Sequence, residues 1–495
     1  MTRLTANPLP VDPTSRKATA VNLFSASRPY MRGLHFSWIS FLTAFTGWFS
    51  VSPLLPSITK DLNLTPAQVG DGNIASVSST IVFRVFIGLM CDRLGPKRVM
   101  ASVLILGAIP TALAGLVRNN TDLVIVRFFI GILGASFVPC QFWTTQLFNS
   151  NAVGVANAIA AGWGNMGGGL TYLLMPLIFD LINRYYPYNV AWRLAMIFPA
   201  FLCIIVGVII VYFSDDCPEG DWSNRGLPTL LIDEAEEDEK ISRISVATER
   251  RTAVKVHKIP TAFHYLLVLI NPNVILMMIM YGCSFGVEVA VDNVIGGFFY
   301  SRFGLSQTLS GLIGSIFGLL NIFSRASGGL TSDYLNRRLG VRGRLFCQFF
   351  FFFFQGAAFI LFRFTSGTLS GAIVTMILIS YFTEVINQLL LHLTAMGIND
   401  NLFLSFALQM QVCCGTSFAI VPYLDPAAVG IVSGLVGSGG NMGGLVFAAI
   451  FKAFSSDILN GFLVIGVIVI ASSFLPFLMS INGRTLIFGN LKRNF

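Results

Sequence analysis

The sequence has little charge and almost no histidine. Only 11% of its 495 residues are Asp, Glu, Lys or Arg, whereas soluble domains carry roughly a quarter, and His occurs four times. So few charged side chains cannot cover the surface of soluble domains of this total length. Scarce histidine also argues against metal clusters, and we expect no metal or cofactor. With 54% hydrophobic residues and a mean hydropathy of +0.72, the chain is predicted to be a polytopic membrane protein.

Features of secreted or catalytic proteins are also lacking. The eight cysteines lie mostly inside apolar stretches, without metal or disulfide spacing, so we interpret them as packing residues. Residues 1–35 are polar and contain no apolar core before a small-residue cleavage site, so a cleaved signal peptide is not expected. No nucleophile and base combine in the apolar spans, which makes a membrane enzyme the least favoured function.

Long apolar runs recur along the chain, and about 20 such residues suffice to cross a bilayer as a helix. Twelve expected spans fall near 36–55, 72–91, 98–117, 124–148, 153–181, 194–213, 273–299, 309–334, 345–363, 369–423, 428–451 and 459–480. The predicted fold is an all-α membrane protein with twelve transmembrane helices in two pseudo-symmetric six-helix halves. The halves are residues 36–213 and 273–480, joined by a central loop at 214–272 and flanked by tails at 1–35 and 481–495.

The basic residues are distributed unevenly between the loops. If both termini are cytoplasmic, the loops and tails on that side hold 22 of the 32 Lys and Arg, and the outer loops hold 7. The other three, Arg84, Arg127 and Arg325, lie within apolar spans. This asymmetry follows the positive-inside rule. The net charge of +8 therefore indicates topology, and no nucleic-acid partner is expected.

The central loop contains an acidic run at 233–239, followed by four basic residues between 250 and 258. We interpret the loop as a solvated linker between the halves. A regulatory segment is the alternative.

Two sequence features recur in both halves. Arg84 precedes Asp92 by eight residues, and Arg325 precedes Asp333 by the same interval. The pentapeptide Gly-Asn-Met-Gly-Gly occurs around Asn165 in the fifth span and around Asn441 in the eleventh. Recurrence at corresponding helices indicates an internal repeat. The glycines allow helices to approach closely or leave backbone polar groups open to a cavity.

The loop after the second span, residues 88–98, reads G-x-x-x-D-R-x-G-P-K-R and resembles the hallmark of the major facilitator superfamily. The resemblance covers nearly the whole chain and implies two six-helix halves with a substrate site between them near the bilayer midplane. It also implies transport by alternating access. We expect Asp92, Arg93 and Asp333 to form a conformational latch at the cytoplasmic helix ends. The alternative is that the basic residues there only set topology.

Arg84 and Arg325 lie deep in their helices, where an arginine costs roughly 2.5–3.5 kcal/mol on insertion scales. That cost recurs at matching places of the repeat. Guanidinium forks bind planar oxyanions bidentately, so two such arginines predict a binding site for a small anion. Asn165 and Asn441 could donate their amides to the same anion, or could form interhelical hydrogen bonds instead. Arg127 lies nearer the start of its span and is interpreted as structural.

The seventh span carries Tyr281, Phe285, Glu288 and Asp292, spaced four, three and four residues apart. That spacing places all four on one helical face. The aromatic pair could sandwich a planar anion, and either acid could carry a proton if its pKa shifts with access. An ion pair with a neighbouring helix is the alternative role for the acids.

Three segments resemble the nitrate/nitrite porter family, which includes the high-affinity nitrate transporters of fungi, algae and plants. They are residues 161–169 and 434–444, similar to the two nitrate signatures of that family, and residues 281–288, similar to its eukaryotic members. The resemblance implies that nitrate is the substrate, with nitrite as a further candidate. It implies that Arg84 and Arg325 grip the anion.

The same resemblance assigns binding roles to Asn165, Tyr281 and Phe285. Eukaryotic members of the family are proton symporters at the plasma membrane, whereas some bacterial relatives exchange nitrate for nitrite. Two arginines around one monovalent anion favour exchange unless acids take part, and Glu288 and Asp292 supply such acids, so we favour symport. A nitrate/nitrite exchanger and a nitrate sensor of the same fold remain alternatives, and an accessory subunit is left open.

One spacing departs from the repeat. Arg84 and Asn165 are 81 residues apart, but Arg325 and Asn441 are 116 apart, an excess of 35. Two full spans within 369–423 would invert the eleventh span relative to the fifth. We therefore expect an insertion near 384–403 that is either a family variation or a retained intron.

Overall fold

The computed structural model describes residues 9–13, 15–149, 152–224, 267–320, 335, 338–383, 417, 420–421, 424–425, 429–481 and 486. Arg325, Asp333 and the insertion expected near 384–403 lie outside these residues. Their expected roles therefore stay predictions.

The first half is a sequence of helices that continues to the central loop. Its principal helices are α1 (Tyr30–Phe49), α2 (Leu55–Leu62), α3 (Pro66–Leu94), α4 (Pro96–Leu113), α5 (Asn120–Ile130), α6 (Phe137–Leu147), α7 (Val153–Asn183), α8 (Tyr188–Ala195) and α9 (Ile197–Phe213). Short 3-10 segments connect some of them, including η1 (Ser52–Leu54) and η3 (Gly131–Ser136). Because η3 joins α5 to α6 without a break, residues Asn120–Leu147 form one span.

The second half repeats this organisation. Its helices are α12 (Pro272–Phe303), α13 (Gln307–Leu319), α15 (Val341–Thr365), α16 (Leu369–Thr383), α20 (Val429–Ala453) and α21 (Ile458–Ser473). Within the described residues, ten helices are long and apolar enough to cross a membrane, and two shorter apolar helices, α13 and α16, lie in the two remaining expected spans. The prediction of an all-α membrane protein in two halves is confirmed.

The surface of the helices is apolar where it would meet lipid. On α3, Phe86 and Leu89 are 60% and 54% exposed, whereas Arg84 on the same helix is fully buried. A helix that turns apolar side chains outward and a charged one inward matches a bilayer as solvent. Buried polar side chains such as Arg84 therefore lie where helices contact one another and not where they face lipid.

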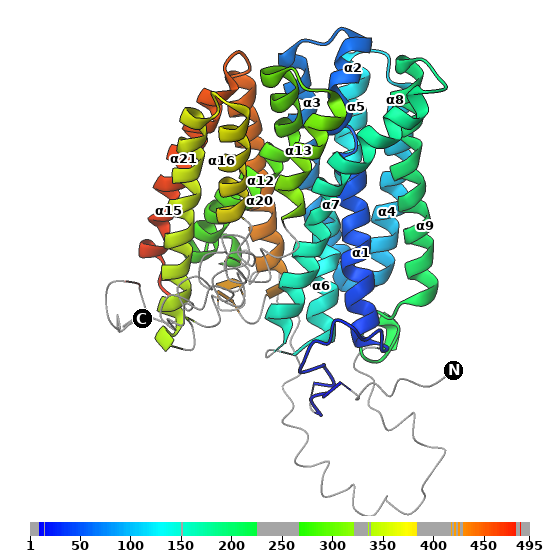
Figure 1. Cartoon of the computed structure of the whole chain (residues 1–495). Helices are drawn as coiled ribbons and strands as arrows, with labels where there is room; N and C mark the ends of the chain where they lie inside the picture. Colours follow the sequence, from blue (N-terminus) through cyan, green and yellow to red (C-terminus); the bar gives the residue numbers. More distant parts are fainter. Residues whose placement is uncertain are drawn as a thin grey trace, which may run out of the picture.

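The two halves stand side by side, with α1–α9 on one side and α12–α21 on the other (Figure 1). They meet along two helix pairs, α3 with α20 and α7 with α13. Because α20 packs against both α3 and α12, it brings the two helices together, and Phe285 of α12 contacts Arg84 of α3.

Glycines allow the close approaches at these contacts. A Cβ at Gly169 of α7 would lie 2.4 Å from the backbone nitrogen of Leu319 in α13. A Cβ at Gly443 of α20 would lie 2.1 Å from the backbone oxygen of Gly282 in α12. Atoms so close would collide, so larger residues there would force the helices apart.

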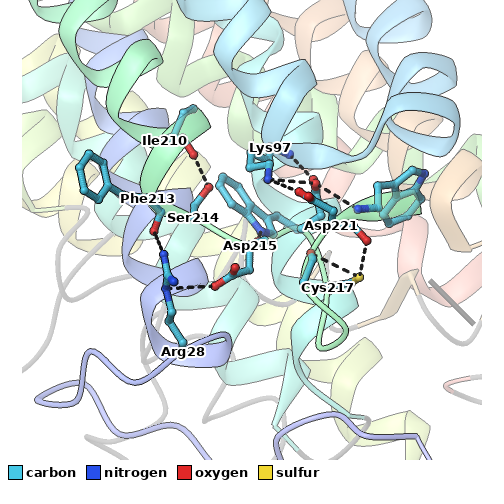
Figure 2. Close-up of polar contacts among 12 residues, drawn as sticks. Arg28, Lys97, Ile210, Phe213, Ser214, Asp215, Cys217 and Asp221 are labelled. Carbon is cyan, nitrogen blue, oxygen red and sulfur yellow. Dashed lines mark hydrogen bonds and ion pairs between the residues drawn. The ribbon is translucent and has the colours of Figure 1, made fainter. Parts of the chain in front are cut away.

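At one end of the bundle, the beginning of α1 meets the end of α9. The Arg28 guanidinium lies 3.5 Å from an oxygen of Asp215 and donates to the backbone oxygen of Phe213 (Figure 2). The segment before α1 also docks there, since the backbone nitrogen of Ala18 donates to the oxygen of Leu147 at 3.0 Å. We call this the inner end and the opposite one the outer end.

At the outer end the two halves are tied together. Lys452, at the end of α20, forms a 2.5 Å ion pair with Asp71, near the start of α3. The Ser57 hydroxyl of α2 donates to the side chain of Gln307, at the start of α13, at 2.8 Å. These contacts close the outer end in this structure.

Candidate anion-binding site

Arg84 bridges the two halves near the middle of α3. Its Nε and Nη2 donate to the backbone oxygen of Gly134 in η3 at 3.2 and 3.0 Å, and its Nη1 donates to the backbone oxygen of Gly437 in α20 at 2.6 Å. Gly134 belongs to the first half and Gly437 to the second. A fully buried guanidinium at the interface of the halves thus binds neutral carbonyl groups.

Asn441 lies one helical turn from Gly437 on α20 and is fully buried. With its amide oxygen turned toward the guanidinium, that oxygen accepts from Arg84 Nε at 2.8 Å and from Nη1 at 3.1 Å. The asparagine of the second signature therefore contacts the arginine of the opposite half. The sequence allows Asn441 either to bind the anion or to form an interhelical hydrogen bond. In this structure its hydrogen-bond partner on the neighbouring helix is Arg84, which is itself a predicted anion-binding residue.

Two aromatic rings pack against this guanidinium, and a third ring stacks on one of them. Arg84 Cζ lies 5.1 Å from the ring centroid of Phe137 and 5.1 Å from that of Phe285. Tyr281 and Phe285 stack with centroids 5.4 Å apart and an angle of 5° between ring planes. Aromatic faces attract cations and exclude water, so the arginine is held in a dry setting where its contacts with an anion would be strong.

Asn165 lies on the face of α7 that meets the second half. It stands three and four residues before Gly168 and Gly169, so the three share one side of the helix. On that side, a Cβ at Gly168 would lie 3.1 Å from a carboxylate oxygen of Asp292, and Gly169 approaches α13. Asn165 is 1% exposed, and within the described residues neither its amide nitrogen nor its amide oxygen has a hydrogen-bond partner.

A buried amide without a partner is rare, since its desolvation costs about 1–3 kcal/mol when no hydrogen bond compensates it. Of the two roles open from the sequence for Asn165, an interhelical hydrogen bond is not formed with any described residue. The amide is thus available to a polar ligand between the halves.

The two acids of α12 are both buried, with Glu288 2% exposed and Asp292 3% exposed. They follow Phe285 toward the outer end, at about 1.5 Å of rise per residue. The Tyr172 hydroxyl of α7 donates to the backbone oxygen of Asp292, which ties this part of α12 to the first half. Both acids therefore lie inside the protein between the aromatic cluster and the outer end.

Two of the three expected latch residues lie in the described part of the inner end. Asp92 and Arg93 are both exposed at the end of α3. The neighbouring Lys97 is buried and pairs with Asp221 at 2.5 Å and with Asp216 at 3.7 Å, both beyond α9 (Figure 2). Within the first half, Lys97 therefore fastens the loop of the hallmark motif to the start of the central loop.

Sequence reasoning missed several residues of this region. Phe137 carries no pattern of its own among 45 phenylalanines, and the carbonyl groups of Gly134 and Gly437 have no sequence signal beyond glycine. Lys97 lies in the quoted motif, but its acidic partners more than 100 residues away have no spacing rule. In the described part of the chain, no group of three or more His, Cys, Asp or Glu could hold a metal.

The sequence profile of the Major Facilitator Superfamily matches residues 37–407. The chain is 34% identical to High affinity nitrate transporter 2.7 of Arabidopsis thaliana, over 91% of this chain and 82% of that protein. It is 34% identical to Nitrate transporter 2.2 of Chlamydomonas reinhardtii, over 88% and 75% of the two chains. It is 26% identical to the Nitrate/nitrite transporter NrtP of Nostoc punctiforme, over 87% and 88%.

Solved structures show the same fold at low identity. The inward open xylose transporter XylE from E. coli superposes with a TM-score of 0.61 at 12% identity, covering 92% of this chain and 97% of that chain. A bacterial homolog of the human lysosomal transporter Spinster, in an inward-facing conformation, gives a TM-score of 0.58 at 12% identity, covering 91% and 95%.

Proposed function

Because this chain belongs to the Major Facilitator Superfamily and, within it, to the nitrate/nitrite porter family, we propose that it imports nitrate by alternating access, coupled to protons. Nitrite is a second candidate substrate. The chain is a multi-pass membrane protein. We place it in the plasma membrane, as the resemblance to the eukaryotic members of the family implies. Both termini are placed in the cytoplasm because the loops and tails on that side hold 22 of the 32 Lys and Arg.

The observation that carries the proposal is the setting of Arg84. Its guanidinium is fully buried between the halves, bonded to carbonyl groups of both, and flanked by aromatic rings. A guanidinium fork matches the planar, delocalised oxygens of nitrate. When nitrate arrives, its oxygens would replace the neutral carbonyl partners with charge-assisted hydrogen bonds.

The surrounding residues fit the remaining needs of a planar monovalent anion. The stacked rings of Tyr281 and Phe285 give a flat apolar wall beside the guanidinium. Asn165, on α7 of the first half, offers an unpartnered amide across the interface from these two rings. We assign Arg325 as the second gripping arginine because it matches Arg84 in the repeat.

Proton coupling explains how the empty site is neutralised when the transporter returns to the outward-facing state. An acid that has released its proton inside is negatively charged and compensates the positive charge of the arginines. An empty site with two arginines would carry buried positive charge across the membrane, which is unfavourable. Glu288 and Asp292 are buried on α12 beside the aromatic cluster, and we assign them as the groups that load and release the proton. With protons as cosubstrate, no internal nitrite is required, which distinguishes the symporter from an exchanger.

Membrane current in a heterologous cell tests this function. A symporter that carries more than one proton per nitrate moves net positive charge inward, so adding nitrate at external pH 5.5 should then produce an inward current larger than the current at pH 7.5. A current that needs preloaded internal nitrite and ignores external pH would favour the exchanger. Nitrate-dependent signalling without uptake, lost on deletion of 228–250, would favour the sensor.

A further inference from the structure

A second buried arginine lies at the interface of the halves, nearer the outer end. Arg127 of α5 is 2% exposed, and its Nη2 donates to Oδ1 of Asn293 in α12 at 2.9 Å. Its Nη1 has no hydrogen-bond partner within the described residues, and no carboxylate there forms an ion pair with it. A buried guanidinium with one neutral acceptor lacks the charge compensation that such groups normally require.

Arg127 lies nearer the outer end than Arg84 does. A Cβ at Gly72 of α3 would stand 3.1 Å from Cδ of Arg127, so Arg127 packs at the level of Gly72. Arg84 lies twelve residues further along α3, which corresponds to about 18 Å toward the inner end. Both arginines donate to groups of the second half, so both lie in the surface that opens when the halves separate.

Asn293 holds the closed state around Arg127. Its Oδ1 also accepts from the Ser52 hydroxyl at 2.9 Å, while its Nδ2 donates to the backbone oxygen of Val289 in its own helix. One amide oxygen therefore joins two elements of the first half. The carboxylate of the adjacent Asp292 points instead toward Gly168 of α7.

We propose that Arg127 is the outer docking residue for the transported anion. The proposal rests on the proposed function. When the outer end opens, Asn293 moves away with the second half, and the guanidinium of Arg127 is exposed with both terminal nitrogens free to donate. Nitrate from outside pairs there first and then moves inward to Arg84, and Asn293 takes its place as the outer end closes.

A purely structural role would make Arg127 one half of a lock with Asn293. The two roles differ in what the partner does. For a lock, removing either side chain has the same effect. If Arg127 is a docking residue, removing Asn293 leaves Arg127 in place to bind nitrate and removes only the side chain that competes with nitrate for it.

The test is the concentration dependence of labelled nitrate uptake in a cell without its own nitrate transport, with surface expression measured for each variant. Arg127→Gln should raise the KM for external nitrate about tenfold, as expected for loss of a charge-assisted contact, with little change in maximal rate. Arg127→Lys should raise it less than threefold because the charge remains. Asn293→Ala should leave KM unchanged or lower it. Arg118→Gln, at an exposed outer-end arginine, is the matched control and should not change KM.

An unchanged KM in Arg127→Gln, or equal effects of Arg127→Gln and Asn293→Ala, would overturn the docking role. An equal rise in Arg118→Gln would also overturn it, because general attraction of anions would then explain the result. If the unaltered chain takes up nitrate, any of these outcomes leaves the proposed function standing. If the unaltered chain at the cell surface takes up none, the proposed function fails and the docking role fails with it.

Discussion

The guanidinium of Arg84, in the first half, donates to the backbone oxygen of Gly437 in the second half at 2.6 Å. Alternating access requires the halves to rock against each other, so a bond across their interface must change in each cycle. A carbonyl acceptor is a suitable temporary partner because it satisfies the guanidinium without a competing negative charge. The carbonyl groups of Gly134 and Gly437 are thus neutral partners of Arg84 that an anion can displace.

The contact between Arg84 and Asn441 predicts non-additive effects on transport. Arg84→Lys should lower kcat/KM about 100-fold or more, since an ammonium cannot reproduce the fork. Asn441→Ala should lower it about tenfold, because the arginine loses an orienting acceptor. The double variant should be no worse than Arg84→Lys alone, since residues in contact couple. Labelled nitrate uptake per transporter at the surface measures all three, and losses that simply multiply would contradict the coupling.

The unpartnered amide of Asn165 predicts a trade between stability and transport. Asn165→Leu should raise the Tm of the purified protein by roughly 1–3 °C, because a buried amide without a partner is removed. The same change should raise the KM for nitrate and weaken the thermal stabilisation that added nitrate gives. Scanning fluorimetry with and without nitrate measures both effects.

Asn441→Leu is the matched control, since that amide accepts from Arg84. Its loss leaves the buried arginine with fewer acceptors and should lower the Tm. A lower Tm in Asn165→Leu as well would mean that the Asn165 amide is satisfied in the unliganded protein.

The repeat made much of this arrangement predictable. Two pentapeptides with Asn165 and Asn441 identified the interface helices, and one helical face gathered Tyr281 with Phe285. The cross-half pairing of Arg84 with Asn441 was not predictable, because a repeat relates equivalent positions and does not say which positions meet. This pairing depends on the orientation of α20 relative to α3. That orientation is set by contacts between residues far apart in the sequence, which no local sequence pattern records.

The surroundings of Arg127 could not be predicted from its position along the span. Its place near the start of the span favours a structural role, and that interpretation stays a prediction. The structure shows two features of Arg127 that its position along the helix does not indicate. The side chain faces the second half, where it donates to Asn293, and one terminal nitrogen has no partner within the described residues.

The close approach of α7 and α13 predicts a variant held open at the outer end. Gly169→Val places side-chain atoms where the backbone of Leu319 lies, with a Cβ contact of 2.4 Å. Uptake should fall more than tenfold, because the outer end cannot close over the anion. A cysteine introduced as Ser57→Cys should react faster with an impermeant thiol reagent in this variant than in the Ser57→Cys parent.

Gly297→Val is the matched control, because a Cβ at Gly297 meets no atom within 4 Å. It should leave uptake and labelling near the parent values. Normal uptake by Gly169→Val would show that the helices need not approach this closely during transport.

The inner-end contacts of Lys97 predict a stability change with a defined pH dependence. The hydrogen bond and charge of Lys97 hold the pKa of Asp221 below its ordinary value. A depressed pKa means that the pair stabilises the fold above the unfolded pKa of about 4 and that this contribution is lost as pH falls through the folded value. Asp221→Asn should therefore lower the Tm by roughly 1–3 °C at pH 7, a modest effect because Asp221 is half exposed.

Asp216 on the same loop should respond in the opposite direction. Burial raises its pKa, although Lys97 and the backbone donors of Lys97 and Trp222 act against this. A raised pKa means that the charged form is the less favoured one in the fold, so acidification relieves a cost. Asp216→Asn should thus lower the Tm less than Asp221→Asn at pH 7, since its amide oxygen can still accept a backbone hydrogen bond. Scanning fluorimetry from pH 8 to pH 4 compares them, and an Asp221→Asn difference that already disappears at pH 6 would exclude this ion pair as its source.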